Sequence, residues 1–485
     1  MKTPPRILIV LENEKFRDPI KYILDLFFSV LGINYELFLN NEITNSRTIN
    51  SQLVISYGKR KPKVNTSYHI HIYESDFFGK NYLKQESLPR LPLERYNNLP
   101  IIYQRENKID SYVRNSKDLI ETDIDIIASS FFMITRCEEI ISKDRDEYDR
   151  FPATASLAYK ENFLDRPIVN EYIELLWNWI NSFNLGFKRK RLWNNKDFAV
   201  CLTHDVDEIK RYKFYPPLGA IFRSIRQKNF KKAKTIFFDY LKTKVYLKQD
   251  IYYDTFDYIT NLEKKCGFRS SFYFMTNDER YSLDNPWFKN LVIKLKKENF
   301  ETGIHPSFNT CNNSKILRRE KEKLEKIIGK KIIGGRQHYL KWAIPESWRV
   351  WERIGLRYDT TLGFADREGF RCGICHPFKP FDVKNNKVVN IWEVPLIIMD
   401  ATLISRKLSP RIGLKKMINL LSVVEKHSGV FVFLWHNSYM TNLFTPEWKE
   451  CFEDFYSFLL EKDCIILPVK NMLNNWEECD AKRMR

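Results

Sequence analysis

Several acids and histidines in the second half of the sequence have the chemistry that metal-assisted hydrolysis requires. Asp205 and Asp207 directly follow the apolar run 198–202, and His305 and His436 end later apolar segments. Carboxylates and imidazoles are suitable ligands for Zn²⁺ and similar divalent ions. A bound ion lowers the pKa of water and polarises a carbonyl oxygen. Asp207 and His305 therefore suit an ion-binding role.

The other members of this set suit proton transfer beside such an ion. Asp205 would accept the proton of the attacking water, and the imidazole of His436 would protonate a leaving amine. Arg336 lies in the segment 334–339, which follows the apolar pair Ile332-Ile333, and would orient Asp205 or hold it electrostatically. The pattern predicts hydrolysis of a carbon–nitrogen bond. Asp205-Val-Asp207 also matches the Asp-x-Asp of metal-dependent glycosyltransferases, which is an alternative interpretation.

Strands and helices must alternate in the second half if these residues are to meet. The apolar runs 198–202, 270–275 and 430–434 predict buried strands, and charged stretches such as 315–328 predict helices between them. Such alternation is typical of a parallel sheet or barrel. In parallel α/β folds ligands bind beyond the carboxyl ends of the strands. Separate strand ends can therefore bring the candidate residues to one site.

The first 190 residues have a different pattern. Short apolar runs predict strands at 6–11, 54–58 and 69–73, and apolar residues at helical spacing predict a helix at 19–31. Together these elements predict a small α/β domain over 1–120. Helices over 123–141 and from Pro167 onward predict a helical connector at 121–190. Residues 191–485 then form the domain that carries the candidate site.

The second half of the chain resembles the metal-dependent polysaccharide deacetylases, the family of chitin, peptidoglycan and chitooligosaccharide N-deacetylases. Their motif Thr-Phe-Asp-Asp-Gly is matched by Thr203-His-Asp-Val-Asp207, and their His-Ser/Thr-x-x-His by His305-Pro-Ser-Phe-Asn309. Their Arg-x-Pro-Tyr corresponds to Arg336-Gln-His-Tyr339, and Leu434-Trp-His436 meets their Leu-x-His. The resemblance covers about 197–470.

This resemblance implies a distorted (β/α) barrel and N-deacetylation of an N-acetylated sugar in bacterial surface-polysaccharide metabolism. It assigns Asp205 as base, Asp207 and His305 as metal ligands, and Asp359 as the acid that steadies the catalytic histidine or arginine. Residues 1–190 are similar to an N-terminal extension of some of these proteins, for which the resemblance implies no activity.

The sequence departs from the family at several positions. Asn309 stands where a second metal histidine is expected, and an amide oxygen shifts preference toward harder ions or weaker binding. We expect Zn²⁺, with Co²⁺, Ni²⁺ or Mn²⁺ as alternatives, and a catalytically silent glycan-binding protein as the alternative function. His338 replaces a proline and would complete the metal shell or contact substrate, and His204 would do either or simply pack. We expect five residues to line the substrate site: His204, His338, Tyr339, Arg371 and His376.

Positive charge is concentrated in one segment of the chain. The net charge is +18, and residues 208–249 contain twelve Lys or Arg against two acids, with apolar residues at helical spacing among them. This segment predicts peripheral contact with an anionic membrane, or alternatively an ordinary helical insertion with a charged outer face. We expect no nucleic-acid partner, because no zinc finger, basic zipper or aromatic nucleic-acid signature accompanies the charge.

Composition indicates a folded protein with large cores, since 44% of the 485 residues are hydrophobic and 15% are aromatic. The nine cysteines are scattered and odd in number, which favours a reducing compartment over a disulfide framework. The start of the chain, residues 1–11, lacks the features of a signal peptide. We therefore expect a cytoplasmic location, with peripheral attachment at the inner membrane face through 208–249.

Overall fold

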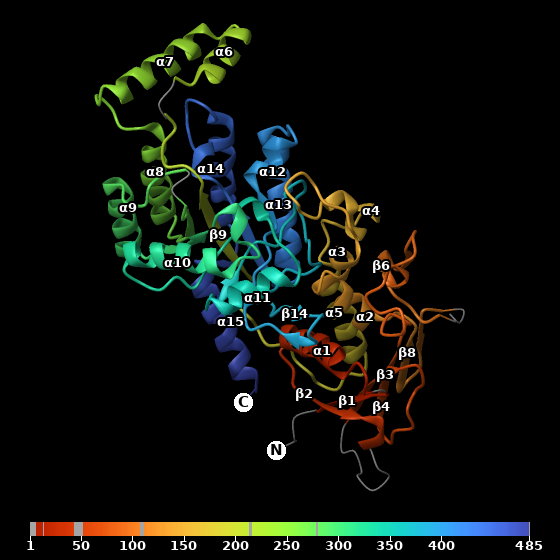
Figure 1. Ribbon diagram of the computed structural model, residues 1–485. Helices are drawn as coiled ribbons and strands as arrows, with labels where there is room; N and C mark the ends of the chain where they lie inside the picture. Colours follow the sequence, from red (N-terminus) through yellow and green to blue (C-terminus); the bar gives the residue numbers. More distant parts are fainter. Residues whose placement is uncertain are drawn as a thin grey trace.

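The computed structural model describes residues 6–12, 14–42, 52–106, 111–212, 216–277 and 280–484, and side chains up to residue 479. Residues 1–5, which bear on the expected location, and 213–215 of the basic segment lie outside this description. Two separate β-sheets follow each other along the chain, one in the first 122 residues and one after residue 197 (Figure 1).

The first sheet has six strands in the order β2-β1-β3-β4-β8-β7, all parallel except for the pairing of β7 with β8. Its strands are β1 (Ile7–Leu11), β2 (Tyr35–Leu39), β3 (Leu53–Gly58), β4 (Tyr68–Tyr73), β7 (Val113–Asn115) and β8 (Leu119–Thr122). Helix α1 (Arg17–Leu31) packs its apolar face on the sheet and ends at Gly32, whose φ of +68° forms a left-handed cap. A small hairpin, β5 (Glu94–Tyr96) and β6 (Leu99–Ile101), lies outside this sheet.

The predicted connector packs against the first sheet through α1. Its helices are α2 (Ile126–Ile134), α3 (Cys137–Ile141), α4 (Leu157–Lys160) and α5 (Ile168–Ser182), and both α2 and α5 contact α1. The single helix expected over 123–141 is broken at Arg136, whose φ is +55°. A non-glycine residue rarely adopts this conformation. Here the buried guanidinium of Arg136 is held by the carboxylates of Glu138 and Glu139.

A buried ion-pair network ties this helical region to the second half of the chain. Glu139 accepts hydrogen bonds from Arg371 through both carboxylate oxygens, at 2.9 and 2.6 Å, and from Nε of Arg136 at 2.8 Å. All three side chains are at most 3% exposed. Burial alone would raise the pKa of Glu139, but the charges and hydrogen bonds of the two arginines hold it at about 2.

We expect Glu139→Gln to lower the free energy of unfolding by about 3–5 kcal/mol, because it leaves the buried guanidinium of Arg371 without its counter-charge. Urea titration followed by tryptophan fluorescence measures this. Glu174→Gln is a matched control, since Glu174 pairs with Arg189 at a site where both side chains are about one-third exposed. That change should cost about 0–1 kcal/mol. Equal costs for the two variants would contradict the structural role of the network.

The second sheet is parallel throughout its pairings and has the order β16-β13-β12-β11-β10-β9-β18-β17, with β19 also paired to β9. Its strands are β9 (Phe198–Val206), β10 (Ser271–Met275), β11 (Glu301–His305), β12 (Gly334–Gly335), β13 (Tyr358–Asp359), β16 (Trp392–Glu393), β17 (Ile398–Met399), β18 (Val430–Leu434) and β19 (Cys464–Ile466). Two further short strands, β14 (Phe381–Asp382) and β15 (Lys387–Val388), form a separate hairpin.

Helices cover this sheet (Figure 1). They are α8 (Ile251–Lys265), α9 (Pro286–Lys297), α10 (Ser314–Ile328), α11 (Glu346–Arg353), α12 (Asp400–Ser405), α13 (Pro410–Lys426), α14 (Pro446–Leu460) and α15 (Val469–Met484). The two ends of the strand order, β16 and β17, are joined by only residues 394–397. Because a chain spans at most about 3.6 Å per residue, this link keeps the two edges close and the sheet curls into a barrel. The expected distorted (β/α) barrel is therefore confirmed.

Strand β9 is the centre of the barrel sheet. Its nine residues are all buried, and it pairs with β10, β18 and β19. Its first five residues, 198–202, are apolar without interruption, which is typical of a parallel strand covered on both faces. Beyond β9 the chain leaves the barrel to form the helices α6 (Leu218–Arg226) and α7 (Phe230–Lys244), which pack on each other before α8 begins.

Among the described residues, no helix has the combination of length and apolarity needed to cross a lipid bilayer.

Candidate metal and catalytic site

The carboxyl ends of the barrel strands bring the predicted residues together. Asp205 lies near the end of β9 and Asp207 just beyond it, while His305 ends β11. Arg336 follows β12 and His436 follows β18 by two residues. Since these strands are parallel, their carboxyl ends share one edge of the sheet.

Asp207, His305 and His338 form a cluster with metal-binding geometry, in which one ligand atom of each lies within 4.8 Å of the others. Oδ1 of Asp207 is 3.2 Å from Nε2 of His305 and 3.5 Å from Nε2 of His338. This oxygen is buried and has no hydrogen-bond partner among the described residues, although the whole side chain is 35% exposed. A buried acceptor without a partner calls for an explanation, and a cation supplies one.

The hydrogen bonding of His305 prepares it as a ligand. Its Nδ1 lies 2.7 Å from the backbone carbonyl oxygen of Arg336. Because a carbonyl oxygen only accepts, Nδ1 must carry the proton, so that Nε2 presents its lone pair to the cluster once the ring is neutral. Metal-binding histidines are commonly fixed in this way through the other ring nitrogen. The residues present therefore fit a divalent ion.

The charges of the cluster favour a cation as well. Burial would raise the pKa of Asp207, but the close approach and charge of His305, with the charges of His436 and His338, hold it well below its usual range. Burial and the neighbouring His305 lower the pKa of His338 to about 3. Asp207 is thus an anion and His338 a neutral imidazole near pH 7, which are the protonation states that metal ligands require.

Asp205 is held by Arg336 and lies beside the cluster of Asp207, His305 and His338 without belonging to it. Nη1 of Arg336 donates to Oδ1 of Asp205 and to the hydroxyl of Thr203, each at 2.9 Å. The guanidinium is itself fixed by Nε, which donates to the carbonyl oxygen of Thr360 at 2.8 Å. Oδ2 of Asp205 is 3.7 Å from Nδ1 of His305. This carboxylate is therefore an oriented anion beside the cluster, as the sequence predicts for Arg336.

His436 lies on the other side of Asp207 and is oriented by Asp400. Its Nδ1 donates to Oδ1 of Asp400 at 2.7 Å, and its backbone N–H donates to the second carboxylate oxygen. Nε2 is 3.9 Å from Oδ2 of Asp207. Burial would lower the pKa of His436, but the charge and hydrogen bond of Asp400, with Asp207 and Asp205, raise it to about 10. The imidazole is therefore protonated near neutral pH.

Asp400 is the acid that contacts His436, a pairing that the sequence does not indicate. The sequence assigns Asp359 as the acid that steadies the catalytic histidine or arginine. In the structure Asp359 accepts from the backbone N–H and hydroxyl of Thr361 and is fully buried in the turn that also carries Thr360, the partner of Arg336. Asp359 therefore supports the arginine side of the site, and Asp400 supports the histidine.

The third position of the metal cluster differs from the expected one. Asn309, which replaces the family histidine, is exposed in a short 3-10 turn at Phe308–Thr310. His338, which replaces the family proline, points its Nε2 at Asp207 instead. The turn after β12 makes this possible, since Tyr339 and Leu340 both have positive φ, at 61° and 53°. We interpret His338 as the third protein ligand.

We expect His338→Ala to weaken zinc binding by more than tenfold, since loss of even an outer partner of a ligand costs about 10–100-fold. Asn309→Ala should leave the affinity within twofold of wild type, because its side chain is exposed. Competition against a chromogenic chelator measures both dissociation constants. If zinc affinity falls strongly in Asn309→Ala and is unchanged in His338→Ala, the third ligand is Asn309 and not His338.

His204 belongs to the core and does not face the site. Its ring has no exposed surface, with Nδ1 bonded to the carbonyl oxygen of Trp435 at 2.7 Å and Nε2 to Glu263 at 2.9 Å. Successive side chains of a strand point to opposite faces, so that Thr203 and Asp205 face Arg336 while His204 faces α8. The prediction of substrate contact is corrected, and the packing alternative describes this residue.

Arg371 and His376 are also interior residues. Arg371 is bound by Glu139 and donates from Nη1 to the carbonyl oxygen of Gly363 at 3.0 Å. His376 has no exposed surface and contacts the amide of Asn170 at 2.8 Å and the carbonyl oxygen of Ser428 at 3.1 Å. Their polar atoms are therefore occupied by the protein, and the expectation that they line the sugar site is corrected.

Tyr339 is the predicted substrate residue that stays accessible, with 36% of its surface exposed. Its ring stacks on Tyr148 of the region between α3 and α4, with centroids 4.9 Å apart, and lies 4.4 Å from the ring of His338. The N-terminal half thus supplies an aromatic side chain beside the site. Cys372 and Cys375, which are spaced as Cys-x-x-Cys, are buried free thiols whose pKa values are raised by burial.

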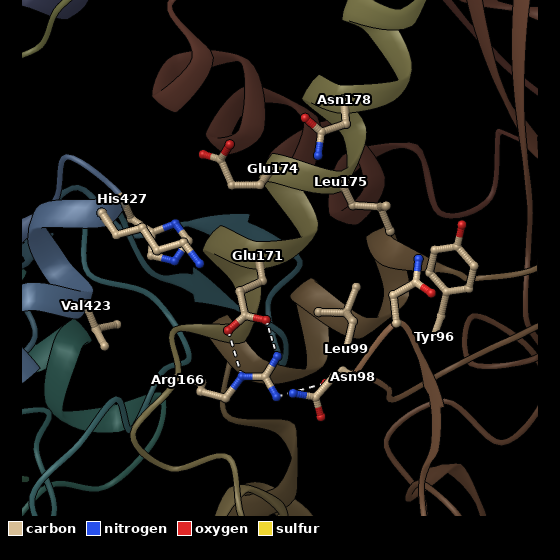
Figure 2. Close-up of a pocket in the computed structure, with 12 residues that line it drawn as sticks. Tyr96, Asn98, Leu99, Arg166, Glu171, Glu174, Leu175, Asn178, Val423 and His427 are labelled. Atoms are coloured by element: carbon tan, nitrogen blue, oxygen red, sulfur yellow. Dashed lines mark hydrogen bonds and ion pairs between the residues drawn. The ribbon is translucent and has the colours of Figure 1, made fainter. Parts of the chain in front are cut away.

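A cavity of about 630 Å³ lies elsewhere, between α5 and the end of α13 (Figure 2). Its lining includes Glu171 and Glu174 of α5, Arg166, and His427, which follows α13. Arg166 is engaged by Glu171 through a bidentate ion pair within the cavity wall. None of the predicted site residues lines this cavity.

Comparison with known proteins separates the two halves of the chain. Residues 8–184 match the model of DUF7033, a family of unknown function. This match spans the first sheet and the helices α2 to α5 together. No curated protein matches the sequence.

Solved structures resemble the chain only weakly. A protein from Mycobacterium smegmatis assigned as a polysaccharide deacetylase is 15% identical, covers 60% of this chain and 93% of its own, and gives a TM-score of 0.40. The PuuE allantoinase is 9% identical over 60% of this chain and 95% of its own, with a TM-score of 0.41. A mutant of the Bacillus anthracis protein BA3943, a CE4-family pseudoenzyme with restored activity, is 13% identical. It covers 57% of this chain and 68% of its own, with a TM-score of 0.30. At such scores no conclusion about the reaction of this chain follows from the similarity.

Proposed function

We propose that the protein is a metal-dependent hydrolase of a carbon–nitrogen bond and that it removes the acetyl group from an N-acetylated sugar. One observation carries the proposal. The buried Oδ1 of Asp207, which has no hydrogen-bond partner among the described residues, faces His305 and His338 beside a fixed carboxylate and a fixed imidazolium.

Asp207, His305 and His338 would hold a divalent ion, for which we propose Zn²⁺ first and Co²⁺, Ni²⁺ or Mn²⁺ as alternatives. Two imidazoles and one carboxylate form a donor set that suits these metals. When bound, such an ion polarises an amide carbonyl and lowers the pKa of water. All other steps belong to the side chains around it.

Asp205 is the proposed general base. Arg336 donates a hydrogen bond to Oδ1 of Asp205, which leaves Oδ2 on the side of His305. A carboxylate that is held in one orientation accepts a proton from water without first having to reorganise. The amide carbon then gains an oxygen and its C–N bond weakens.

His436 is the proposed general acid. Breaking the C–N bond requires a proton on the departing nitrogen, and the imidazolium carries one at Nε2 because Asp400 stabilises its charge. The base and the acid are thus different groups with opposite charges, which lets both work at one pH. Acetate and a free amino sugar are the products.

The substrate proposal rests on accessible aromatic surface and on the sequence motifs. Tyr339 and Tyr148 offer ring faces next to His338, and sugar rings pack on such faces through their apolar C–H groups. The motifs resemble those of N-deacetylases, so we place the reaction in the cytoplasmic metabolism of a bacterial surface polysaccharide. The glycosyltransferase alternative is disfavoured, because Arg336 neutralises the first acid of Asp205-Val-Asp207.

The test is metal content and acetate release of the full-length protein after reconstitution with zinc, cobalt, nickel or manganese. We expect about one ion per chain and acetate release from N-acetylated oligosaccharides that a chelator abolishes and the same ion restores. Stoichiometric metal without acetate from any N-acetylated sugar would overturn the substrate class. Absence of bound metal after all four reconstitutions would overturn the mechanism.

A further inference from the structure

We propose that the helical hairpin of α6 and α7, with the chain that follows it up to Gln249, docks the protein on an anionic lipid bilayer. We call residues 216–249 the basic hairpin. The proposal concerns a surface remote from the ion cluster and does not depend on the reaction proposed above.

The basic hairpin stands apart from the body of the protein. In Figure 1 α6 and α7 project from one end of the barrel, at the opposite end of the molecule from the first sheet. The two helices pack mainly on each other through small or partly apolar side chains, among them the buried Ser224, Ala233 and Ile236. Much of their surface therefore faces outward.

This outward surface is unusually apolar. Of the seventeen large hydrophobic side chains that are exposed in the described part of the chain, ten lie in these thirty residues: Leu218, Phe222, Ile225, Phe230, Phe237, Phe238, Leu241, Val245, Tyr246 and Leu247. Their exposures range from 37% to 94%. Exposed apolar patches of this kind mark surfaces that bind a partner or a membrane.

The apolar residues form stripes along the helices. Leu218, Phe222 and Ile225 follow one face of α6 at spacings of four and three residues. Phe230, Phe237 and Leu241 follow one face of α7 at spacings of seven and four. Side chains at such spacings share one side of a helix, so each helix has an exposed apolar stripe in addition to the face that it buries.

Positive charge surrounds the stripes. The basic hairpin contains nine Lys or Arg and a single acid, Asp239, which is itself bound by Lys248 and by the hydroxyl of Tyr212. Basic residues beside exposed apolar ones are the pattern of helices that lie in the interface of an anionic bilayer, where the rings enter the acyl boundary and the lysines meet lipid phosphates. A protein partner would need an apolar groove and acidic side chains at matching positions, whereas an anionic bilayer presents apolar acyl chains and phosphates over its whole surface.

A cavity at the base of the basic hairpin extends this match. It has a volume of about 530 Å³, and its lining includes Lys210, Lys244 and Lys248 together with the exposed Tyr246 and Leu247. Ammonium groups gathered around a hollow are suited to a lipid phosphate, while the adjacent apolar side chains are suited to the glycerol and acyl region. The cavity and the helical stripes therefore select the same partner.

The base of the basic hairpin is fixed to the barrel. Asp250 accepts the backbone N–H groups of Arg211 and Tyr212, at 2.8 and 2.9 Å, and also caps α8 through the N–H of Tyr252. Residues 211–212 and 250 are the two points where the chain leaves and rejoins the barrel. Because the hairpin is inserted directly after Asp207, docking would turn the edge of the barrel that holds the ion cluster toward the membrane.

Vesicle flotation with the full-length protein tests the proposal. We expect recovery with vesicles of phosphatidylglycerol and phosphatidylcholine and at least about tenfold less with phosphatidylcholine alone, with binding to the anionic vesicles falling as salt screens the charges. Equal recovery with the two compositions would overturn an anionic docking site. The triple variant Phe222→Ser, Phe230→Ser, Phe237→Ser should lose binding at least tenfold, and so should Lys231→Gln, Lys234→Gln, Lys242→Gln.

Matched controls change the same residue types elsewhere. Ile293→Ser with Leu460→Ser removes exposed apolar side chains, and Lys315→Gln, Arg319→Gln, Lys326→Gln removes three exposed charges from α10. Both controls should float like wild type. Metal content and melting temperature should stay at wild-type values in every variant, since the altered side chains are exposed. The proposal would be overturned if the control variants also lost vesicle binding. It would equally be overturned if the basic hairpin bound nucleic acid or a second copy of the chain and did not bind vesicles.

Discussion

The Asp207→Ala variant should be purified without bound metal and should release no acetate above background. Asp207 supplies the single anionic ligand of the cluster, and its Oδ1 faces both His305 and His338. Two neutral imidazoles alone would neither balance the charge of a divalent ion nor complete its coordination. Elemental analysis after zinc reconstitution and an enzymatic assay for acetate measure the two losses.

Asp205→Asn is the matched control, because it alters the neighbouring carboxylate and leaves the cluster in place. This variant should retain about one metal ion per chain and lose about 10²–10⁴-fold in kcat, the usual contribution of a general base. The pair therefore separates ion binding from proton transfer. Stoichiometric zinc in Asp207→Ala would show that the ion lies elsewhere, and full activity in Asp205→Asn would remove that residue from the reaction.

Asp400→Asn should lower kcat by about 10²-fold and move the high-pH limb of the rate profile to lower pH. In the wild type Asp400 raises the pKa of His436 to about 10, so the imidazole remains a proton donor through neutral pH. An amide supplies no charge, so the pKa of His436 falls toward its usual range and the acid form is lost earlier as pH rises. Rates of the zinc-loaded proteins over the pH range 5–10 measure the shift.

The same linkage has a consequence for stability. His436 has a higher pKa in the folded state than in the unfolded chain, so its ion pair with Asp400 stabilises the fold fully below about pH 6.5 and loses this effect as pH rises through about 10. Asp400→Asn should remove this pH dependence. Adding Asp400→Asn to His436→Ala should change kcat no further, because Asp400 acts through the imidazole. An additional loss in the double variant would give Asp400 a separate role.

The long buried strands could be predicted from the sequence, as could the residues at their ends. The runs 198–202 and 430–434 are apolar without interruption, which is typical of parallel strands covered on both faces. Parallel pairing then places every carboxyl end on one edge, so the sequence predicts that Asp205, Asp207 and His436 lie close together.

Two contacts of the site depend on features that a linear pattern does not contain. The sequence does not assign Asp400 to His436, because the neighbour of His436 depends on the order of strands in the sheet. β17, which precedes Asp400, pairs with β18, but it is two residues long and leaves no periodic signal. The sequence leaves the third ligand open between Asn309 and His338, because its position depends on a turn with two left-handed residues, which local composition does not indicate.

The interior polar residues could not be predicted for a related reason. Arginine is mostly exposed in proteins, which favours a substrate surface for Arg371. The sequence predicts the same surface for His376 and leaves His204 open between substrate contact and packing. Each is buried because a partner far away in the sequence satisfies it, as Glu139 does for Arg371 across 232 positions. Such pairings form when the two halves of the chain pack together. The hydrophobic pattern of each half predicts its own strands and helices but not how the halves pack.

The pairing of Glu139 with Arg371 also bears on any attempt to express the barrel alone. The helix at Cys137–Ile141 supplies the counter-charge of Arg371 and helps to bury it. A barrel fragment that begins near residue 190 would therefore present this arginine without its anion, on a surface that the full chain covers. The N-terminal half thus acts as an internal counter-ion for the half that carries the site.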